Sequence, residues 1–216
     1  MSEPRSHFVF TFLRHGESIG NAESRWQGQA DFQLTETGRA QARALAVRWS
    51  AEGETFDLII ASPLARARET AEIISAGLGG VPLEFDPRWL ERAIGEYSGL
   101  TSQEVRQLPQ PDFYTPYDSV GGDGEGDWEL FLRGGQALHS LLRRPVGKYL
   151  VVSHGGLLNQ VMHAVVGVAP HANRGGPRFR FGNTGFARLV YYPAQHRWEI
   201  DVLNDRFHWK DETASA

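Results

Sequence analysis

Cysteine is absent from this chain, which excludes disulfides, cysteine nucleophiles and thiolate metal sites. Long apolar runs are missing too, because none approaches the roughly 18–20 residues that span a bilayer. The first residues, MSEPRSHF, lack the charged-then-apolar pattern of a signal peptide. We therefore expect a protein of the reducing cytoplasm, with no membrane partner.

An excess of positive charge is also lacking. The formal net charge is −4 and the isoelectric point is about 6.1, which argues against a protein that mainly binds nucleic acid. The chain has 216 residues and an ordinary share of hydrophobic residues, 41%. This length suits one substantial domain better than two with full cores, so we expect a single domain over residues 1–216.

Several catalytic motifs do not occur. There is no G-x-S-x-G turn of a serine hydrolase and no G-x-x-x-x-G-K-[ST] phosphate loop. The stretch GGDGEGD at 121–127 is a poor dinucleotide motif, because it follows no predicted strand and its acids would repel phosphate. No internal repeat or low-complexity tract is present.

Predicted strands and helices alternate along the chain. Apolar, β-branched or aromatic runs predict strands at 8–13, 56–63, 148–156, 185–193 and 197–205. Helical patterns cover 35–51, 64–78, 127–144 and 157–167. This order predicts an α/β fold, a three-layer α/β/α sandwich with a mostly parallel sheet and an antiparallel edge.

The helix predicted at 35–51 has Thr35 as its N-cap. Alanine and valine recur at helical spacing and predict its buried face, with arginines on the other face. The predicted buried residues are Ala40, Ala44, Val47 and Ala51, and the predicted exposed ones are Arg39, Arg43 and Arg48.

One long segment is irregular. Residues 108–127 carry three prolines and then glycines interleaved with acids, which excludes a long regular element. A loop of this length favours a lid or insertion, which we place at about 101–127, and a mobile solvated excursion stays open as the alternative. Its aromatic residues and acids predict an acidic, aromatic lid.

Polar residues follow three of the predicted strands. The first run ends in Arg14, His15 and Gly16, the second in Ser62, and the third in 153–156, Ser-His-Gly-Gly. If the first and third strands are parallel neighbours, His15 and His154 meet at one end of the sheet, where the glycines would let a ligand approach. A zinc site would need a third protein ligand at suitable spacing, which is missing. Arginine beside a neutral histidine suits phosphoryl transfer, because guanidinium matches phosphate oxygens and imidazole is a nucleophile.

These residues resemble the histidine phosphatase superfamily, in its phosphoglycerate mutase-like branch, over about residues 7–204. The resemblance rests on motifs in the family's order: LRHGES, QG, LTETG, SPLARARETA, LERAIGEYSGL, VVSHGG and NTG. It implies that His15 becomes phosphohistidine, that Arg14 and Arg66 bind the transferred phosphoryl group, and that His154 is the second histidine of the pocket. Glu91 matches the general acid/base. Residues matched to the phosphate site are Asn21, Gln27, Gly28, Gly155 and Thr184.

The resemblance leaves three activities open. We prefer a metal-independent phosphomonoester hydrolase that needs no cofactor, because the insertion at 112–127 has no lysine or arginine and Ile94 replaces an expected tyrosine. The alternative is a phosphoglycerate mutase, and only that would need 2,3-bisphosphoglycerate. A non-catalytic phosphate-binding domain ranks below both. We expect a small-molecule phosphomonoester as the partner, and a homodimer is left open.

Some basic residues have no motif. Arg178 and Arg180 alternate with phenylalanines along RFRF, so we expect both to lie on one face. They could bind a second anionic group of the substrate, but we prefer the interpretation that this face is exposed to solvent. We expect six histidines to be structural or exposed: His7, His139, His163, His171, His196 and His208.

Overall fold

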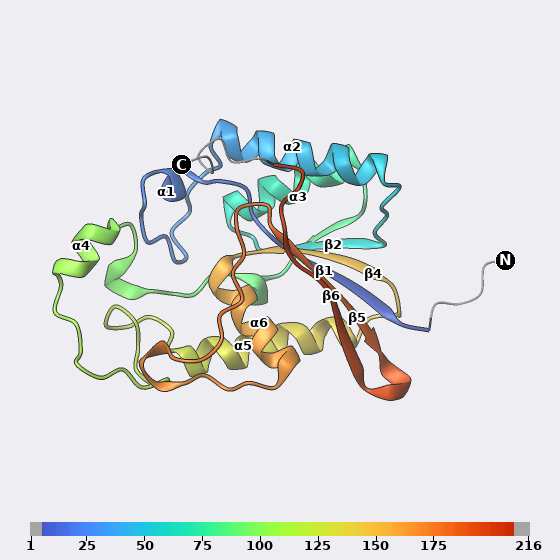
Figure 1. Ribbon diagram of the computed structural model, residues 1–216. Coiled ribbons are helices and arrows are strands. Elements are labelled where there is room, and N and C mark those ends of the chain that lie inside the picture. The colour runs from blue at the N-terminus through green and yellow to red at the C-terminus, as the bar shows by residue number, and fades with distance from the viewer. Residues whose placement is uncertain (1–5, 210–216) are drawn as a thin grey trace.

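The computed structural model describes residues 6–209 and has a six-stranded sheet at its centre, in the order β3-β2-β4-β1-β5-β6 (Figure 1). The strands are β1 (Phe8–Arg14), β2 (Leu58–Ala61), β3 (Leu83–Phe85), β4 (Lys148–Ser153), β5 (Phe186–Tyr192) and β6 (Arg197–Asp205). The first four strands are parallel, and β5 is antiparallel to both β1 and β6. The predicted α/β sandwich with a mostly parallel sheet is confirmed; the short β3 was not predicted.

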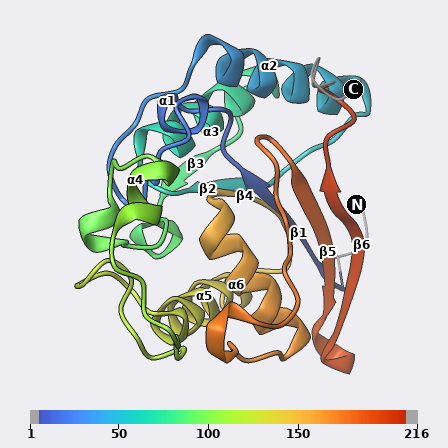
Figure 2. The ribbon, with the colours of Figure 1, turned by 60° about the vertical axis from the view of Figure 1, so that its left-hand side comes forward.

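Helices cover both faces of the sheet (Figures 1 and 2). One layer holds α2 (Glu36–Ala51) and α3 (Ala65–Gly77), and the other holds α5 (Asp127–Leu142) and α6 (Gly155–Val166). Short elements complete the described chain: α1 (Ile19–Ala22), α4 (Ser102–Gln107), η1 (Pro87–Trp89), η2 (Gly95–Tyr97), η3 (Ala172–Arg174) and η4 (Pro193–Gln195). Over residues 6–209, every helix is too short or too polar to cross a bilayer.

Each face of the sheet has its own core. Phe10 and Phe12 of β1 point into the core shared with α5 and α6, whereas Leu13 points into the core shared with α2 and α3. This follows from the two-residue period of a strand. Arg14 is the last residue of β1 and His15 follows it, so both come where the strand leaves the core.

Helix α2 begins as predicted and buries a different face. The Thr35 hydroxyl caps it by accepting a hydrogen bond from Gly38 N at 3.0 Å. However, Val47 is 70% exposed, while Leu45 and Trp49 are fully buried. The predicted buried face is therefore wrong, because burying one leucine and one tryptophan removes far more apolar area from water than burying small alanines.

The irregular segment predicted at 108–127 lacks helix and strand up to residue 126, Asp127 being the first residue of α5, and it is anchored at several points. Its later part pairs with the chain after η1, through Glu96 N to Gly121 O at 2.9 Å and Glu125 N to Ala93 O at 2.8 Å. Its middle part meets the 167–185 segment, where Tyr114 N donates to Asn173 Oδ1 at 2.7 Å (Figure 1). Whether 101–127 acts as a lid stays a prediction, and the ends of the predicted domain lie outside the described residues.

Candidate active site

His15 and His154 directly follow two adjacent parallel strands, β1 and β4. In the β1–β4 register Arg14 lies opposite Ser153, so the next residues, His15 and His154, emerge side by side. Their ring centroids are 5.1 Å apart and both side chains are buried. The His15 Nδ1 atom lies 2.7 Å from Gly16 O. Because a carbonyl oxygen only accepts, Nδ1 carries the proton and Nε2 keeps its lone pair.

Burial keeps both imidazoles neutral. It lowers the pKa of His15 and of His154 well below the usual value, and the Arg66 charge lowers each further. His154 Nε2 contacts Ser62 Oγ at 2.8 Å, at the end of β2. Within residues 6–209 no group of three His, Asp or Glu side chains is arranged to hold a metal ion.

Arg14 and Arg66 flank the histidines and are held by backbone carbonyls. Arg66, near the start of α3, donates to Gly28 O at 2.7 Å and to Ala30 O at 2.8 Å. Arg14 donates to Phe181 O at 2.9 Å. Burial lowers the pKa of Arg66 to about 10, so it stays protonated at neutral pH. Neither arginine forms an ion pair within the described residues, so both charges are available to an anion.

A cavity of about 560 Å³ opens beside His15, which we call the phosphate pocket. The predicted residues that line it are Arg14, His15, Asn21, Gln27, Gly28, Arg66 and Glu91. The Ser18 hydroxyl lies 2.9 Å from Asn21 Oδ1 and 2.7 Å from Gln27 Oε1, which links these two side chains. Asn183 belongs to the NTG motif but was not predicted as a site residue. Its side chain donates to Asn21 Oδ1 at 3.0 Å and to His15 O at 3.2 Å.

Thr184 lies behind the pocket. It is fully buried, and its hydroxyl donates to Asn183 O at 2.8 Å and lies 2.9 Å from His208 Nε2. Its N–H lies 3.1 Å from Arg14 O and 3.3 Å from His15 O. Thr184 thus braces the backbone of the Arg14–His15 pair, and its predicted contact with phosphate stays a prediction.

The structure gives a different reason for glycine at position 16 from the one predicted. A Cβ atom there would lie 2.5 Å from Gly38 O, and one on Gly38 would lie 2.0 Å from Glu17 O. The chain after β1 thus crosses the first turn of α2 at two facing glycines. The missing side chain allows backbone to approach backbone, whereas we had expected it to make room for the ligand.

Glu91 comes from the loop after η1 and is held at the N-terminus of α6. Its carboxylate accepts hydrogen bonds from Gly156 N at 3.0 Å, Leu157 N at 3.1 Å and Arg92 N at 2.8 Å. A Cβ on Gly156 would lie 2.5 Å from Glu91 Oε1, so glycine leaves the space that the carboxylate occupies. Helix N-termini stabilise carboxylates, which explains this position.

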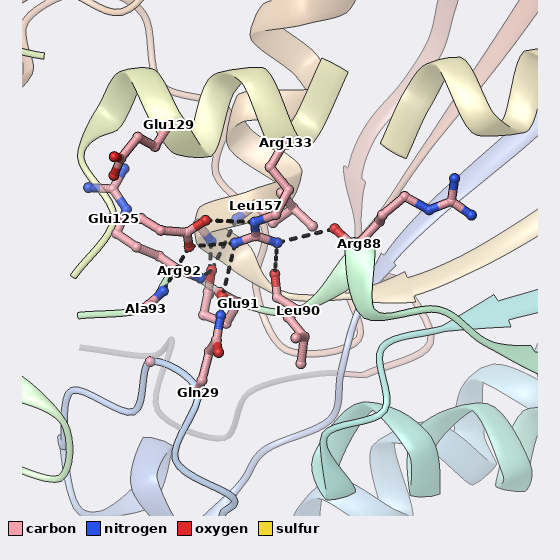
Figure 3. Close-up of polar contacts among 12 residues, drawn as sticks. Gln29, Arg88, Leu90, Glu91, Arg92, Ala93, Glu125, Glu129, Arg133 and Leu157 are labelled. Carbon is pink, nitrogen blue, oxygen red and sulfur yellow. Dashed lines mark hydrogen bonds and ion pairs between the residues drawn. The ribbon is translucent and has the colours of Figure 1, made fainter. Parts of the chain in front are cut away.

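Arg133 of α5 holds the backbone that carries Glu91 (Figure 3). Its guanidinium donates to Leu90 O at 2.6 Å and to Glu91 O at 3.1 Å, and it pairs with Glu125 at 2.6 Å. Glu125 in turn accepts from Ala93 N at 2.9 Å. Burial would raise the pKa of Glu125, but the hydrogen bonds from Arg133 and Ala93 lower it overall. No sequence motif marks Arg133 as a site residue, because its partners are mostly backbone atoms that are distant in the sequence.

A second cavity of about 810 Å³ adjoins the phosphate pocket, and we call it the outer cavity. Both cavities share the wall residues Trp26, Gln27, Gly28, Glu91 and Arg178. The outer cavity is also lined by Gly155, Arg180 and two of the histidines that we expected to be structural or exposed, His163 and His171. His163 is buried, with Nε2 2.7 Å from Pro177 O, and His171 is exposed.

The wall of the outer cavity differs from the predicted acidic, aromatic lid. Phe113 and Tyr117 of the insertion are 58% and 72% exposed and line neither cavity. The aromatic wall comes instead from Trp26, Phe179 and Phe181. The acids Glu125 and Asp127 are neutralised by ion pairs with Arg133 and Arg92. Glu125 and Asp127 thus fasten the end of the insertion to its neighbours.

Comparisons with known proteins agree with this geometry. The family model "Histidine phosphatase superfamily (branch 1)" matches residues 10–206. Probable phosphoglycerate mutase GpmB of Photorhabdus laumondii is 37% identical over 91% of this chain and 92% of that protein. Among solved structures, YhfR of Bacillus stearothermophilus has a TM-score of 0.79 and 29% identity, over 93% of this chain and 98% of that chain.

A mycobacterial glucosyl-3-phosphoglycerate phosphatase has a TM-score of 0.76 and 26% identity, over 91% of this chain and 98% of that chain. The names of these relatives include both phosphatase and mutase. The matched region contains both histidines, both buried arginines and Glu91. This chain belongs to the histidine phosphatase superfamily.

Proposed function

We propose that this protein is a phosphomonoester hydrolase that works through a phosphohistidine on His15. The observation that carries the proposal is the neutral His15 ring, with Nδ1 bound to Gly16 O and Nε2 free, between the unpaired charges of Arg14 and Arg66. Charge in the transition state of phosphoryl transfer spreads over the equatorial oxygens, where arginine and histidine can stabilise it. We propose that these groups suffice without a metal or other cofactor.

The reaction has two steps. His15 Nε2 attacks phosphorus and forms the N–P bond as the ester P–O bond breaks, and Glu91 gives a proton to the leaving oxygen. Water then attacks phosphorus while Glu91 takes one of its protons, and the N–P bond breaks to release inorganic phosphate and neutral His15.

Trapping the intermediate tests this proposal. A phosphomonoester labelled with ³²P is mixed with the protein and quenched in alkali, in which phosphohistidine survives. We expect label on wild type and none on His15→Ala, and turnover that is unchanged by a chelator. Label on the His15→Ala protein would refute the proposal.

Phosphoglycerate mutase is the second candidate. The 37% identical relative with that name favours it, as do Arg178 and Arg180, since they add positive charge that the insertion lacks. The test follows 3-phosphoglycerate with and without 2,3-bisphosphoglycerate. Fast formation of 2-phosphoglycerate with little phosphate release would replace the hydrolase proposal by the mutase one. A cytoplasmic location, a small-molecule substrate and a homodimer remain predictions.

A further inference from the structure

The outer cavity lies where the leaving group must go. Glu91 lines both cavities, so a phosphate beside His15 places its ester oxygen at their boundary. This step rests on the proposed function, in which Glu91 protonates that oxygen. The outer cavity, about 810 Å³, is larger than a three-carbon acid would fill and falls in the usual range for small-molecule sites.

Two arginines stand at this cavity without partners. Arg178 and Arg180, which we call the rim arginines, line the outer cavity, and Arg178 also lines the phosphate pocket. Both side chains are exposed, and neither has a hydrogen bond or ion pair with another described residue. The Arg180 charge reaches the phosphate site, because it helps to lower the pKa of Arg14, after the larger effect of burial.

The segment that carries the rim arginines is anchored. Phe179 N donates to Asn159 Oδ1 of α6 at 2.8 Å, and the Phe179 ring packs edge-on against His163 with centroids 5.5 Å apart. Phe179 is half-buried, whereas its neighbours Arg178 and Arg180 are exposed, and all three line the outer cavity. The position of both charges is therefore set by the fold, although their side chains reach into solvent.

The carboxylates of the outer cavity do not neutralise the rim arginines. Two carboxylates line it, Glu91 and Asp127. The Glu91 carboxylate already accepts hydrogen bonds from three N–H groups, and Asp127 already forms an ion pair with Arg92. The outer cavity thus combines an aromatic wall with two available guanidinium groups, whose planar forks suit oxyanions.

We propose that the rim arginines form a second anion subsite. The substrate is then a phosphomonoester whose leaving group is larger than a three-carbon acid and carries an anionic group of its own. The phosphate binds beside His15, the apolar part of the leaving group lies against the aromatic wall, and the second anion lies between Arg178 and Arg180.

The experiment compares benzyl phosphate with 4-carboxybenzyl phosphate, whose leaving alcohols differ little in acidity. For wild type at low salt we expect kcat/KM to be about five- to tenfold higher for the carboxylated ester, as one charge-assisted contact partly open to water would give. In Arg178→Gln/Arg180→Gln this ratio should fall to about one. An ester with a second phosphonate in place of the carboxylate identifies which anion binds better.

The control variant is Arg43→Gln/Arg197→Gln, which removes the same charge from exposed arginines away from both cavities and should keep the wild-type ratio. A wild-type ratio near one, or an unchanged ratio in the rim variant, would overturn the subsite. Calorimetric binding of the matched benzyl phosphonates to His15→Ala gives a second readout. If the carboxylated phosphonate binds more tightly than the plain one while wild type hydrolyses neither ester, the proposed function fails and the subsite stands.

Discussion

The phosphate pocket and the outer cavity share a wall, but they are built differently. The pocket is lined by the end of β1, the start of α3 and the segment 20–28, and Arg14 and Arg66 in its wall are bound to backbone carbonyls. The outer cavity is formed largely by connecting segments, and its rim arginines are exposed. We therefore expect the proposed chemistry to depend on residues where β1 ends and α3 begins, and the choice of leaving group to depend on connecting segments, which vary more easily.

Glu91 belongs to both regions. It sits on a loop, yet its carboxylate is fixed by the first turn of α6 and its backbone by Arg133 (Figure 3). Substitutions in the pocket and substitutions around Glu91 should consequently differ in how their effect on activity varies with the substrate. Changes in the pocket should affect every substrate, and changes around Glu91 should depend on the leaving group.

Removing the nucleophile should have the largest effect. His15→Ala is expected to reduce kcat by about 10⁴-fold or more for every phosphomonoester, because the covalent route is lost. Phosphate release measures this, with circular dichroism as the check on folding. Full turnover in this variant would contradict the role of the pocket.

Replacing the general acid should have the next largest effect, and one that depends on the leaving group. Glu91→Gln is expected to lower kcat/KM for benzyl phosphate by about 10²–10⁴-fold. For 4-nitrophenyl phosphate the loss should be much smaller, because nitrophenolate leaves without a proton. Equal losses on both esters would show that Glu91 does not act as the acid.

Loosening the support of Glu91 should give a smaller version of the same pattern. Arg133→Gln cannot hold Glu125 and the two carbonyls together, so we expect a loss of about tenfold on benzyl phosphate and less on 4-nitrophenyl phosphate. The matched control is Arg144→Gln, whose ion pair with Glu84 is near the opposite end of α5. If Arg133→Gln slows both esters equally, its role is general stability.

Stability should vary with pH because of the pocket. Burial lowers the pKa of His15 and His154 in the folded protein, so the unfolded chain binds more protons below about pH 6.5 and the free energy of unfolding falls as pH falls. The slope from each histidine approaches about 1.4 kcal/mol per pH unit as pH falls well below 6.5, and is about half of that at pH 6.5. Urea unfolding between pH 7.5 and 5.5 measures the slope, and His15→Ala should reduce it. A slope unchanged in that variant would contradict burial of neutral His15.

Much of the pocket was predictable because local patterns specify it. Apolar runs that end in RHG and SHGG mark strands entering a site, and adjacent parallel strands bring such ends together. The face of α2 was not predictable from the spacing of its alanines, since the energy of burial depends on which side chains the sheet and α3 can accommodate.

The amino-acid sequence by itself determined the alternation of strands and helices, the buried strand ends and the family motifs, because these depend on neighbours along the chain. Only the tertiary structure decided that Gly16 serves contact with Gly38, that Thr184 lies behind the pocket and that two acids of the insertion pair with arginines. It also placed Arg133 behind Glu91 and the rim arginines beside the outer cavity. These contacts join residues far apart in the chain, so their geometry follows from how the layers pack.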